Sequence, residues 1–434
     1  MPNVSPSVHQ LANGLKVVTI NLPGWRSLTT YLVVKVGSRD ETAQTNGLAH
    51  FLEHMVFKGT EKYRDSTELS AAIEGVGGYL NAWTSLDHTA YWNVVPSEHW
   101  RLGLEVASEL VFRPKLRLDD LDRERGVILE EIKRIEDDPE SLVDDLSGRQ
   151  IFGPHPLGRT IIGRPAQING LTIDHFRDFH KEFYKPFGII AIVVGDLAGK
   201  DIVKEVERLS PASAPSDHIQ AASSAVPPNS PPKPFSRSSQ RALSLHSKPI
   251  EQFNFVIAVA ASVLKLTDQN AAALEVLNAV LGRGMSSRLF REVREKRGLC
   301  YSIRSSLQAL EETGILAIGG GVNQHKVPEA LSAIKEELSK LVRTPVEDEE
   351  LTKARNLVIG SLELSVDQPA YLARWYGIDR LFGQTASIEE VIEEVKAVKA
   401  ASIQRLAEQL FDWRHLTITA VGPGEVAHLE EFLS

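Results

Sequence analysis

The feature that most constrains the fold is a strand pattern that occurs in both halves of the 434-residue chain. The segment 188–196, GIIAIVVGD, is almost wholly apolar and ends in a glycine turn, and the segment 416–423, LTITAVGP, has the same character. Their glycines, Gly195 and Gly422, lie 422 − 195 = 227 residues apart, and the earlier apolar segments 30–36 and 255–260 are separated by a similar interval. This period is far longer than that of a solenoid repeat, so the pattern predicts a duplicated domain.

A change of composition separates the two copies. Residues 210–240 are rich in Pro, Ser and Ala and lack apolar periodicity, which predicts an exposed linker. We therefore expect one domain over residues 1–209 and a related one over 241–434. A hairpin signal around Asn13-Gly14, with strands mixed among long amphipathic helices, predicts an α+β fold. In each domain we expect a largely antiparallel sheet covered by helices on one face.

Composition excludes several classes of function. The formal net charge is −9 and no dense basic stripe occurs, which argues against nucleic acid as a partner. No apolar run reaches about 18 residues, and the first ten residues lack the features of a signal peptide, so we expect a cytoplasmic protein with no membrane span. The single cysteine, Cys300, excludes an intrachain disulfide and a multi-cysteine metal site.

The segment 46–57, NGLAHFLEHMVF, reads as a buried helix that carries His50, Glu53 and His54. The histidines are one turn apart, so they lie on the same face within about 40°. Two such imidazoles can bind one metal ion, with Glu53 beside them as a general base for a metal-activated water. This is the His-x-x-Glu-His order of inverted zinc peptidases. The alternative is a helix with two core histidines, which the motif alone leaves open.

Zinc requires a third protein ligand, and a second helix offers one. The segment 124–134, ERGVILEEIKR, places Glu124 and Glu131 seven residues apart, which puts them on one face within about 20°. Glu131 would be the ligand, and Glu124 would orient a histidine from behind. Helix pattern alone leaves open that these glutamates are simply solvated. Glu130 could be mistaken for the ligand, but it points about 100° away from Glu131.

The whole motif set resembles the M16 family of zinc peptidases, which includes pitrilysin, insulin-degrading enzyme and the mitochondrial processing peptidase. The resemblance rests on His50-x-x-Glu53-His54, on a glutamate 131 − 54 = 77 residues later, and on Glu124 seven residues before it. The segment 77–91 also resembles the family's strand beside the active site. The resemblance to the family extends over essentially the whole chain and is to the family's short, two-domain members. It implies one zinc ion per chain, bound by His50, His54 and Glu131.

Further expectations follow from that resemblance. Arg294 and Tyr301, seven residues apart, resemble the family pair that faces the zinc, with Tyr301 sharing the oxyanion. The strand around Asn81, Ala82 and Thr84 would bind a peptide or unfolded protein as an added strand, which gives broad specificity. Because longer relatives carry four such domains in one chain, we expect a homodimer, or a heterodimer with a related chain.

The function predicted is therefore a zinc-dependent endopeptidase acting on peptides or unfolded polypeptides. Two alternatives belong to other classes. One is a non-catalytic or partner subunit of a heteromeric processing complex, although such subunits usually lose metal ligands. The other is a quorum-signal lyase with a similar metal motif, which is a small single domain without the duplication. Four other histidines lack ligand spacing, and we interpret them as structural or surface residues: His88, His99, His175 and His180.

Overall fold

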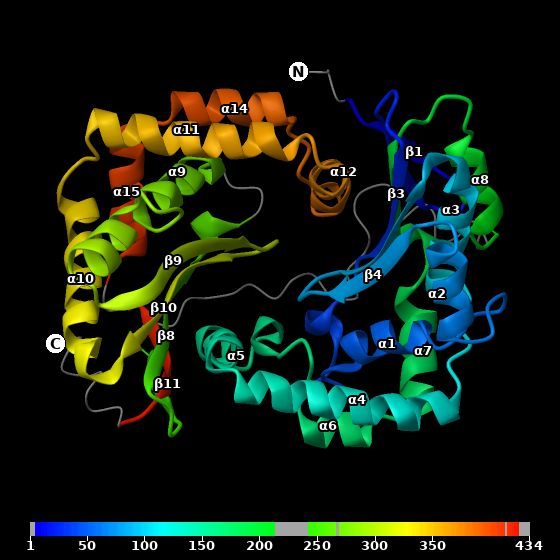
Figure 1. Ribbon diagram of the computed structural model, residues 1–434, viewed down its shortest axis with the longest axis horizontal. Coiled ribbons are helices and arrows are strands. Elements are labelled where there is room, and N and C mark those ends of the chain that lie inside the picture. Colours follow the sequence, from blue (N-terminus) through cyan, green and yellow to red (C-terminus); the bar gives the residue numbers. More distant parts are fainter. Residues whose placement is uncertain (1–4, 213–241, 266–268, 413–414, 425–434) are drawn as a thin grey trace. The chain divides into compact units, whose positions relative to one another are not determined.

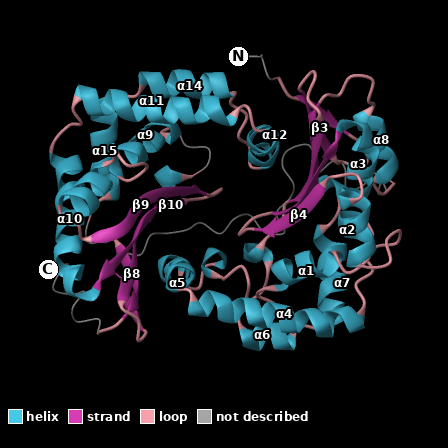
Figure 2. Ribbon diagram, in the orientation of Figure 1, coloured by secondary structure: helices cyan, strands magenta, loops and turns pink. Residues whose placement is uncertain are grey.

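The computed structural model describes residues 5–212, 242–265, 269–412 and 415–424 (Figure 1). Most of the predicted linker, 213–240, lies outside the described residues. The described chain divides into two compact units. The first contains residues 5–133, 159–212 and 365–385, and the second contains 134–158, 242–364 and 386–424 apart from the gaps above. Both units contain a sheet and several helices (Figure 2).

The first unit is built on a six-stranded sheet with the order β1-β2-β6-β3-β5-β4. Its strands are β1 (Ser7–Gln10), β2 (Lys16–Asn21), β3 (Ser27–Val34), β4 (Tyr79–Thr84), β5 (Thr89–Pro96) and β6 (Ile189–Gly195). Neighbouring strands are antiparallel except β2 and β6, which are parallel. The predicted first hairpin is confirmed, since Gln10 of β1 pairs with Lys16 of β2.

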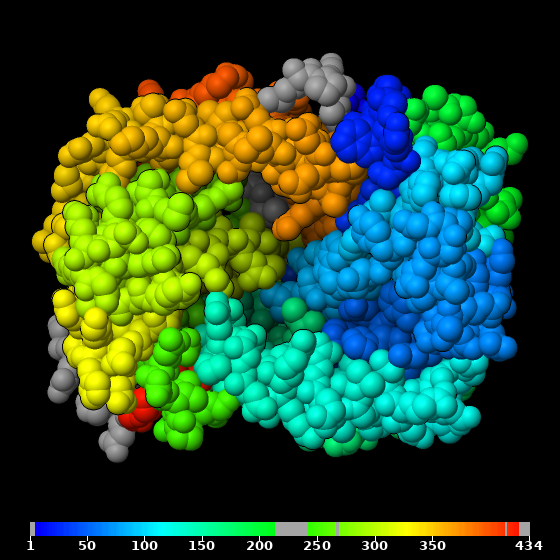
Figure 3. Space-filling view, viewed as in Figure 1, coloured from blue at the N-terminus to red at the C-terminus, as the bar shows by residue number. Residues whose placement is uncertain are grey.

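Helices cover one face of this sheet, where α3 packs on β3 and β5 and α1 packs on β4 and β5. The helices that the first half of the sequence contributes to this unit are α1 (Leu48–Val56), α2 (Ser66–Glu74), α3 (Trp100–Phe112), α4 (Leu118–Asp137, whose last four residues belong to the second unit), α6 (Pro165–Gly170), α7 (Ile173–Phe183) and α8 (Ile202–Leu209). All apolar residues of α1 are buried. The much longer α4 is charged on its outer side and lies at the surface (Figure 3).

The second unit contains a five-stranded sheet with the order β7-β11-β8-β10-β9. Its strands are β7 (Ala242–Ser247), β8 (Gln252–Ala261), β9 (Cys300–Ala309), β10 (Gly314–Asn323) and β11 (Thr417–Gly422). Again one pair is parallel, β7 with β11, and the others are antiparallel. Strand for strand, this order repeats β2-β6-β3-β5-β4 of the first sheet. The predicted α+β fold of two related domains is confirmed.

The helices of the second unit bury a large aliphatic core against this sheet. They are α9 (Ala271–Leu281), α10 (Val327–Arg343), α11 (Asp348–Ser365), α14 (Ile388–Ala397) and α15 (Ala400–Leu410), with a π-helix over Phe290–Lys296. Helix α5 (Pro139–Phe152) also belongs to this unit, but its residues are not part of that core. Among the described helices of both units, none combines the length and the apolar character needed to span a bilayer.

The sequence halves exchange one helical segment each. Helix α5, from the first half, packs on β8 and β11 of the second unit. The segment with α12 (Pro369–Ala373), a π-helix over Arg374–Ile378 and α13 (Asp379–Leu381) comes from the second half and packs on β3 and β6 of the first. There Gly377 lies so close to the Ile192 side chain that an added Cβ would collide with it. In the space-filling view this orange segment lies against the blue residues of the first unit (Figure 3). Hydrophobic periodicity does not reveal this exchange.

Candidate metal centre

Helix α1 is fixed at its first turn by a buried carboxylate. The Glu41 side chain accepts hydrogen bonds from the backbone N–H of Gly47 at 2.8 Å and of Ala49 at 2.7 Å, and from Asn46 Nδ2 at 2.8 Å. Gly47 has φ +97°, and a Cβ there would lie 2.6 Å from the carbonyl oxygen of Ile162. A glycine is therefore required where α1 begins. Burial raises the pKa of Glu41 to about 8, although these three hydrogen bonds act to lower it.

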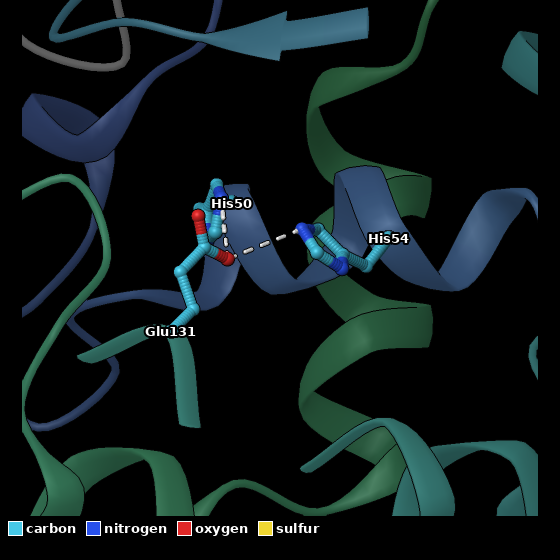
Figure 4. A group of neighbouring side chains, drawn as sticks. All are labelled: His50, His54 and Glu131. Carbon is cyan, nitrogen blue, oxygen red and sulfur yellow. Dashed lines mark ion pairs between the residues drawn. The ribbon is translucent and has the colours of Figure 1, made fainter. Parts of the chain in front are cut away.

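The predicted ligands meet between α1 and α4 (Figure 4). The rings of His50 and His54 have centroids 4.8 Å apart. Oε2 of Glu131 lies 3.9 Å from Nε2 of His50 and 3.7 Å from Nε2 of His54. One ligand atom from each residue lies within 4.8 Å of the other two, and among the described residues this is the one such group of His, Cys, Asp and Glu. The geometry thus joins two imidazoles and one carboxylate around a common point.

The neutral state of His50 favours a bound cation. Burial, together with the neighbouring His54, lowers the pKa of His50 to about 3, so His50 is neutral and offers a lone pair. Burial alone would lower the pKa of His54, but its hydrogen bond to Glu124 and the nearby carboxylates outweigh burial and raise it. His54 Nδ1 donates to Glu124 Oε1 at 2.9 Å, which leaves Nε2 directed toward Glu131.

Glu124 is held in its ionised form from both sides. Burial would raise the pKa of Glu124, but the hydrogen bonds from His54 and Lys58 lower it. Nζ of Lys58 lies 2.6 Å from Oε2 of Glu124, on the side away from His54. A carboxylate behind a histidine fixes the ring orientation and makes the ring a better donor to a metal. Two histidines, one glutamate and such a support fit a zinc ion with a fourth position left for water or substrate.

Glu53 lies on α1 beside this group and is nearly buried, with 9% of its surface exposed. Oγ1 of Thr84, the last residue of β4, donates to Oε2 of Glu53 at 2.6 Å. Burial raises the pKa of Glu53 above its ordinary value, while Thr84 and His54 act in the opposite direction. A carboxylate with a raised proton affinity that is not itself in the ligand group is suited to take and return a proton.

Strand β4 lies at the edge of its sheet, and β5 is its one neighbour among the described strands. Ser85 N–H donates to the carbonyl of His88 at 2.8 Å, which closes the β4–β5 turn. Since bonded and non-bonded pairs alternate in antiparallel strands, Leu80, Ala82 and Thr84 direct their backbone groups away from β5. The Asn81 side chain already accepts the outward N–H of Ala82, at 2.8 Å. Of the predicted substrate-binding residues, Ala82 and Thr84 thus direct backbone groups toward a possible added strand. The Asn81 side chain occupies one of these groups, the Ala82 N–H.

Arg294 and Tyr301 lie together in the second unit. The guanidinium carbon of Arg294 is 5.4 Å from the centroid of the Tyr301 ring and 4.5 Å from that of Phe290. Tyr301, in β9, has 82% of its surface exposed. The pair is therefore assembled, and its phenol is available to a ligand.

The remaining candidates lie away from the ligand group. Glu130 is exposed and pairs with Lys133, with its Oε1 2.6 Å from Nζ. His88 is held in the β4–β5 turn by Asp87 and Ser85. His180 Nε2 lies 2.8 Å from the carbonyl oxygen of Val111. The other two have local contacts: His99 lies beside Glu98, and His175 accepts from the Thr172 N–H.

Sequence reasoning missed Glu41, Lys58 and the bond from Thr84 to Glu53. An acidic residue shortly before a glycine that starts a helix is a weak signal for Glu41, since carboxylates favour helix N-termini. Lys58 lies one turn after His54, but nothing in the sequence shows that it meets Glu124. Each of these contacts depends on tertiary packing.

Comparison with known proteins gives consistent results. Residues 16–164 match the model of the insulinase family, peptidase family M16, and residues 170–358 match that of the M16 inactive domain. A protein named an uncharacterized zinc protease from Streptomyces coelicolor is 32% identical over 95% of this chain and 88% of its own length. One with the same description from Bacillus subtilis is 32% identical over 92% of this chain and 94% of its own.

Solved structures share the fold. A protease from Helicobacter pylori superposes with a TM-score of 0.89 at 23% identity, covering 97% of this chain and all of its own. An M16 inactive domain structure from Pseudomonas fluorescens superposes with a TM-score of 0.84 at 18% identity, covering 98% of this chain and 99% of its own. The sequence matches extend over both halves of the chain, and the metal-ligand geometry lies in the half that matches the insulinase model. This chain belongs to the M16 family of peptidases.

Proposed function

We propose that this protein is a zinc-dependent endopeptidase that hydrolyses peptides or unfolded polypeptides. The observation that carries the proposal is the group of His50, His54 and Glu131, whose ligand atoms lie within 4.8 Å of one another, with Glu53 alongside. The zinc proteases among the relatives support the same chemistry. One such group per chain, within the described residues, supports one zinc ion per chain.

The residues of this chain have distinct tasks in that reaction. A zinc ion at the three ligands would supply Lewis acidity. It would lower the pKa of water, so that a nucleophile strong enough to attack a peptide is available at neutral pH. Glu53 takes the proton from the attacking water and returns it to the leaving amine. Thr84 holds the Glu53 carboxylate by the 2.6 Å hydrogen bond, and Glu124 fixes the His54 ring. The buried setting of Glu53 raises its pKa, which supports its role in accepting the proton.

The outer side of β4 is the proposed docking position for the substrate. An extended peptide would form backbone hydrogen bonds with Ala82 and Thr84, and the Asn81 side chain would first release the Ala82 N–H. Thr84 contacts Glu53, so a peptide on this edge would pass beside the catalytic base. Pairing through the backbone accepts many sequences, which supports unfolded chains as the substrate class.

Tyr301 is the proposed donor to the oxyanion, with Arg294 beside it. We propose that they act from the partner chain of a homodimer. The test mixes a Glu53→Gln chain with a Tyr301→Phe chain under conditions that exchange subunits. If the pair acts between chains, the mixed dimer regains one intact site and its activity rises above that of either parent. No gain, with exchange confirmed by mass spectrometry, would contradict the between-chain arrangement.

The function itself is tested by incubating the purified protein with a library of unstructured peptides. We expect cleavage that a zinc chelator abolishes and that added zinc restores. A Glu53→Gln protein with normal zinc content is the matched control, and it should leave the library intact. Zinc-loaded wild-type protein that cleaves none of the peptides would instead support the non-catalytic subunit.

A further inference from the structure

Four aromatic residues form a continuous row on the first sheet, here called the aromatic row: Tyr79 and Trp83 of β4, Trp92 of β5 and Tyr31 of β3. The Tyr79 ring meets Trp92 edge-on with centroids 5.6 Å apart, and Trp92 stacks on Tyr31 at 5.7 Å. Tyr31 meets Trp83 edge-on at 5.8 Å. Each ring is thus braced by another, which makes the row a rigid apolar surface.

The aromatic row lies on the sheet face opposite α1 and α3. Tyr31 pairs in register with Ile192, and Ile192 contacts Gly377 of the segment from the second half of the chain. The neighbouring positions face the other way: Asn93, next to Trp92, donates to the carbonyl of Gly103 in α3. Thr84, next to Trp83, reaches Glu53 in α1. The edge strand β4 therefore has the catalytic group on one face and aromatic rings on the other.

The two ends of the row differ in exposure. Trp83 is half-buried, and its Nε1 donates to His88, whose ring lies 5.8 Å from that of Phe382. At the other end Tyr79 has 56% of its surface exposed, so its ring is open to a ligand. Trp92 behind it is also half-buried.

The position of the proposed peptide along the β4 edge determines which of its side chains contact these rings. Side chains of an added strand alternate between the two faces of the sheet, and those opposite each other on neighbouring strands share a face. Peptide residues opposite Ala82 and Thr84 face the metal side. Residues opposite Tyr79, Asn81 and Trp83 face the aromatic row, so two peptide side chains four residues apart would lie over Tyr79 and Trp83.

We propose that Tyr79, backed by Trp92, forms a specificity subsite for an aromatic or large aliphatic side chain of the substrate. This inference rests on the proposed peptidase function and on docking along β4. Tyr79 is five residues from Thr84, which is about 17 Å along a strand. The subsite therefore acts far from the reacting bond. Only peptides long enough to reach it gain from it, and it selects extended chains with apolar residues over short or polar ones.

The test measures binding rather than cleavage, in a Glu53→Gln background that leaves the peptide intact. Register is first set with a peptide series in which a single Phe is moved along a Ser- and Thr-rich chain. The best position is then compared as Phe against Ser in a fluorescence anisotropy titration. We expect Phe to bind about 3- to 10-fold more tightly, as for one added aromatic contact. Tyr79→Thr should remove that preference, and Tyr79→Phe should keep it.

Trp25→Thr is the control, because Trp25 is an exposed aromatic on the loop between β2 and β3. It should leave both affinities unchanged. Peptides that bind but show the same Phe preference in the Tyr79→Thr protein would overturn the subsite while leaving the proposed function intact. Failure of every peptide to bind, with zinc present, would overturn docking on β4 and the subsite with it. Circular dichroism and zinc content confirm that each variant is folded.

Discussion

The two compact units share one sheet topology but differ in the helix that follows their second shared strand, β3 in the first unit and β8 in the second. In the first unit α1 carries His50, Glu53 and His54, and in the second α9 carries alanine, leucine and valine at most positions. Both helices are mostly buried, so packing against a sheet is common to both. The fold thus requires an apolar helix after β3 and after β8. Within the described residues, the group of His50, His54 and Glu131 lies in the first unit, and the second unit has no such group.

One polar contact is nevertheless present in both units. Glu53 accepts a hydrogen bond from Thr84 on the edge strand of the first sheet. Asn278 of α9 accepts one at 2.6 Å from Ser305, which lies on the edge strand of the second sheet. The second unit keeps the bond between helix and edge strand without a charge and without ligands. We infer that the bond is a structural feature of the fold and that the first unit uses it to orient its base.

The largest effect should come from removing the third ligand. Glu131→Gln should lose most of its zinc and all detectable peptidase activity, because a neutral amide is a poor third ligand. Elemental analysis after gel filtration measures the zinc content. Glu130→Gln is the matched control, since that exposed neighbour pairs with Lys133 and should keep full zinc. The reverse pattern, with zinc lost from Glu130→Gln alone, would refute the ligand assignment.

Removing the base should separate metal binding from chemistry. Glu53→Gln should retain zinc while kcat falls by about 10²- to 10⁴-fold, the usual loss when proton transfer is removed. Fluorogenic peptide assays at matched zinc content measure this. Near-wild-type kcat in the zinc-loaded variant would contradict Glu53 as the base.

The shared helix-to-strand bond gives a direct test of the comparison. Thr84→Val should keep zinc but lower kcat about tenfold, because one hydrogen bond to a charged group is lost. Asn278→Leu should leave kcat unchanged but reduce the free energy of unfolding by about 1–3 kcal/mol, since Ser305 loses its buried partner. Urea unfolding and steady-state kinetics on both variants distinguish the outcomes. Equal kinetic effects from the two substitutions would show that the bond has no special role in the first unit.

The exchanged segment adds a smaller, pH-dependent effect. Burial raises the pKa of Asp379 to about 6 from its usual 3.8; nearby Arg374 and His88 lower it, and Asp87 raises it. Because the folded pKa is the higher one, stability falls as pH rises from about 4 through about 6. Asp379→Asn should therefore gain on the order of 1 kcal/mol above pH 6 and nothing near pH 4. Thermal unfolding at both pH values measures it, and an equal gain at the two would exclude titration of Asp379 as the cause.

Local patterns predict the helices that carry the candidate metal ligands. The i, i+4 spacing places His50 and His54 on one face of a helix, and the structure has them there. Apolar periodicity likewise locates α4, although that helix extends beyond the predicted segment at both ends. Such features depend on neighbours within one or two turns, which a sequence shows directly.

Long-range contacts are harder to predict from one sequence. The approach of Glu131 to the histidines depends on how α4 packs beside α1, so spacing alone left it open and the family resemblance was needed. Glu41 caps α1, and Asn81 accepts a hydrogen bond from the Ala82 N–H. No sequence pattern predicts either contact. The catalytic roles of Glu53, Arg294 and Tyr301 stay predictions.

The exchange of helical segments has a consequence for biosynthesis. The last strand of the first sheet ends at Gly195, but the segment that covers Ile192 ends at residue 385, which is 385 − 195 = 190 residues later. At about 5–20 residues per second, a ribosome needs roughly 10–40 s to supply that segment. During this interval the apolar face around Ile192 has no permanent cover. The nascent chain would therefore be a client for chaperones until its second half is nearly complete.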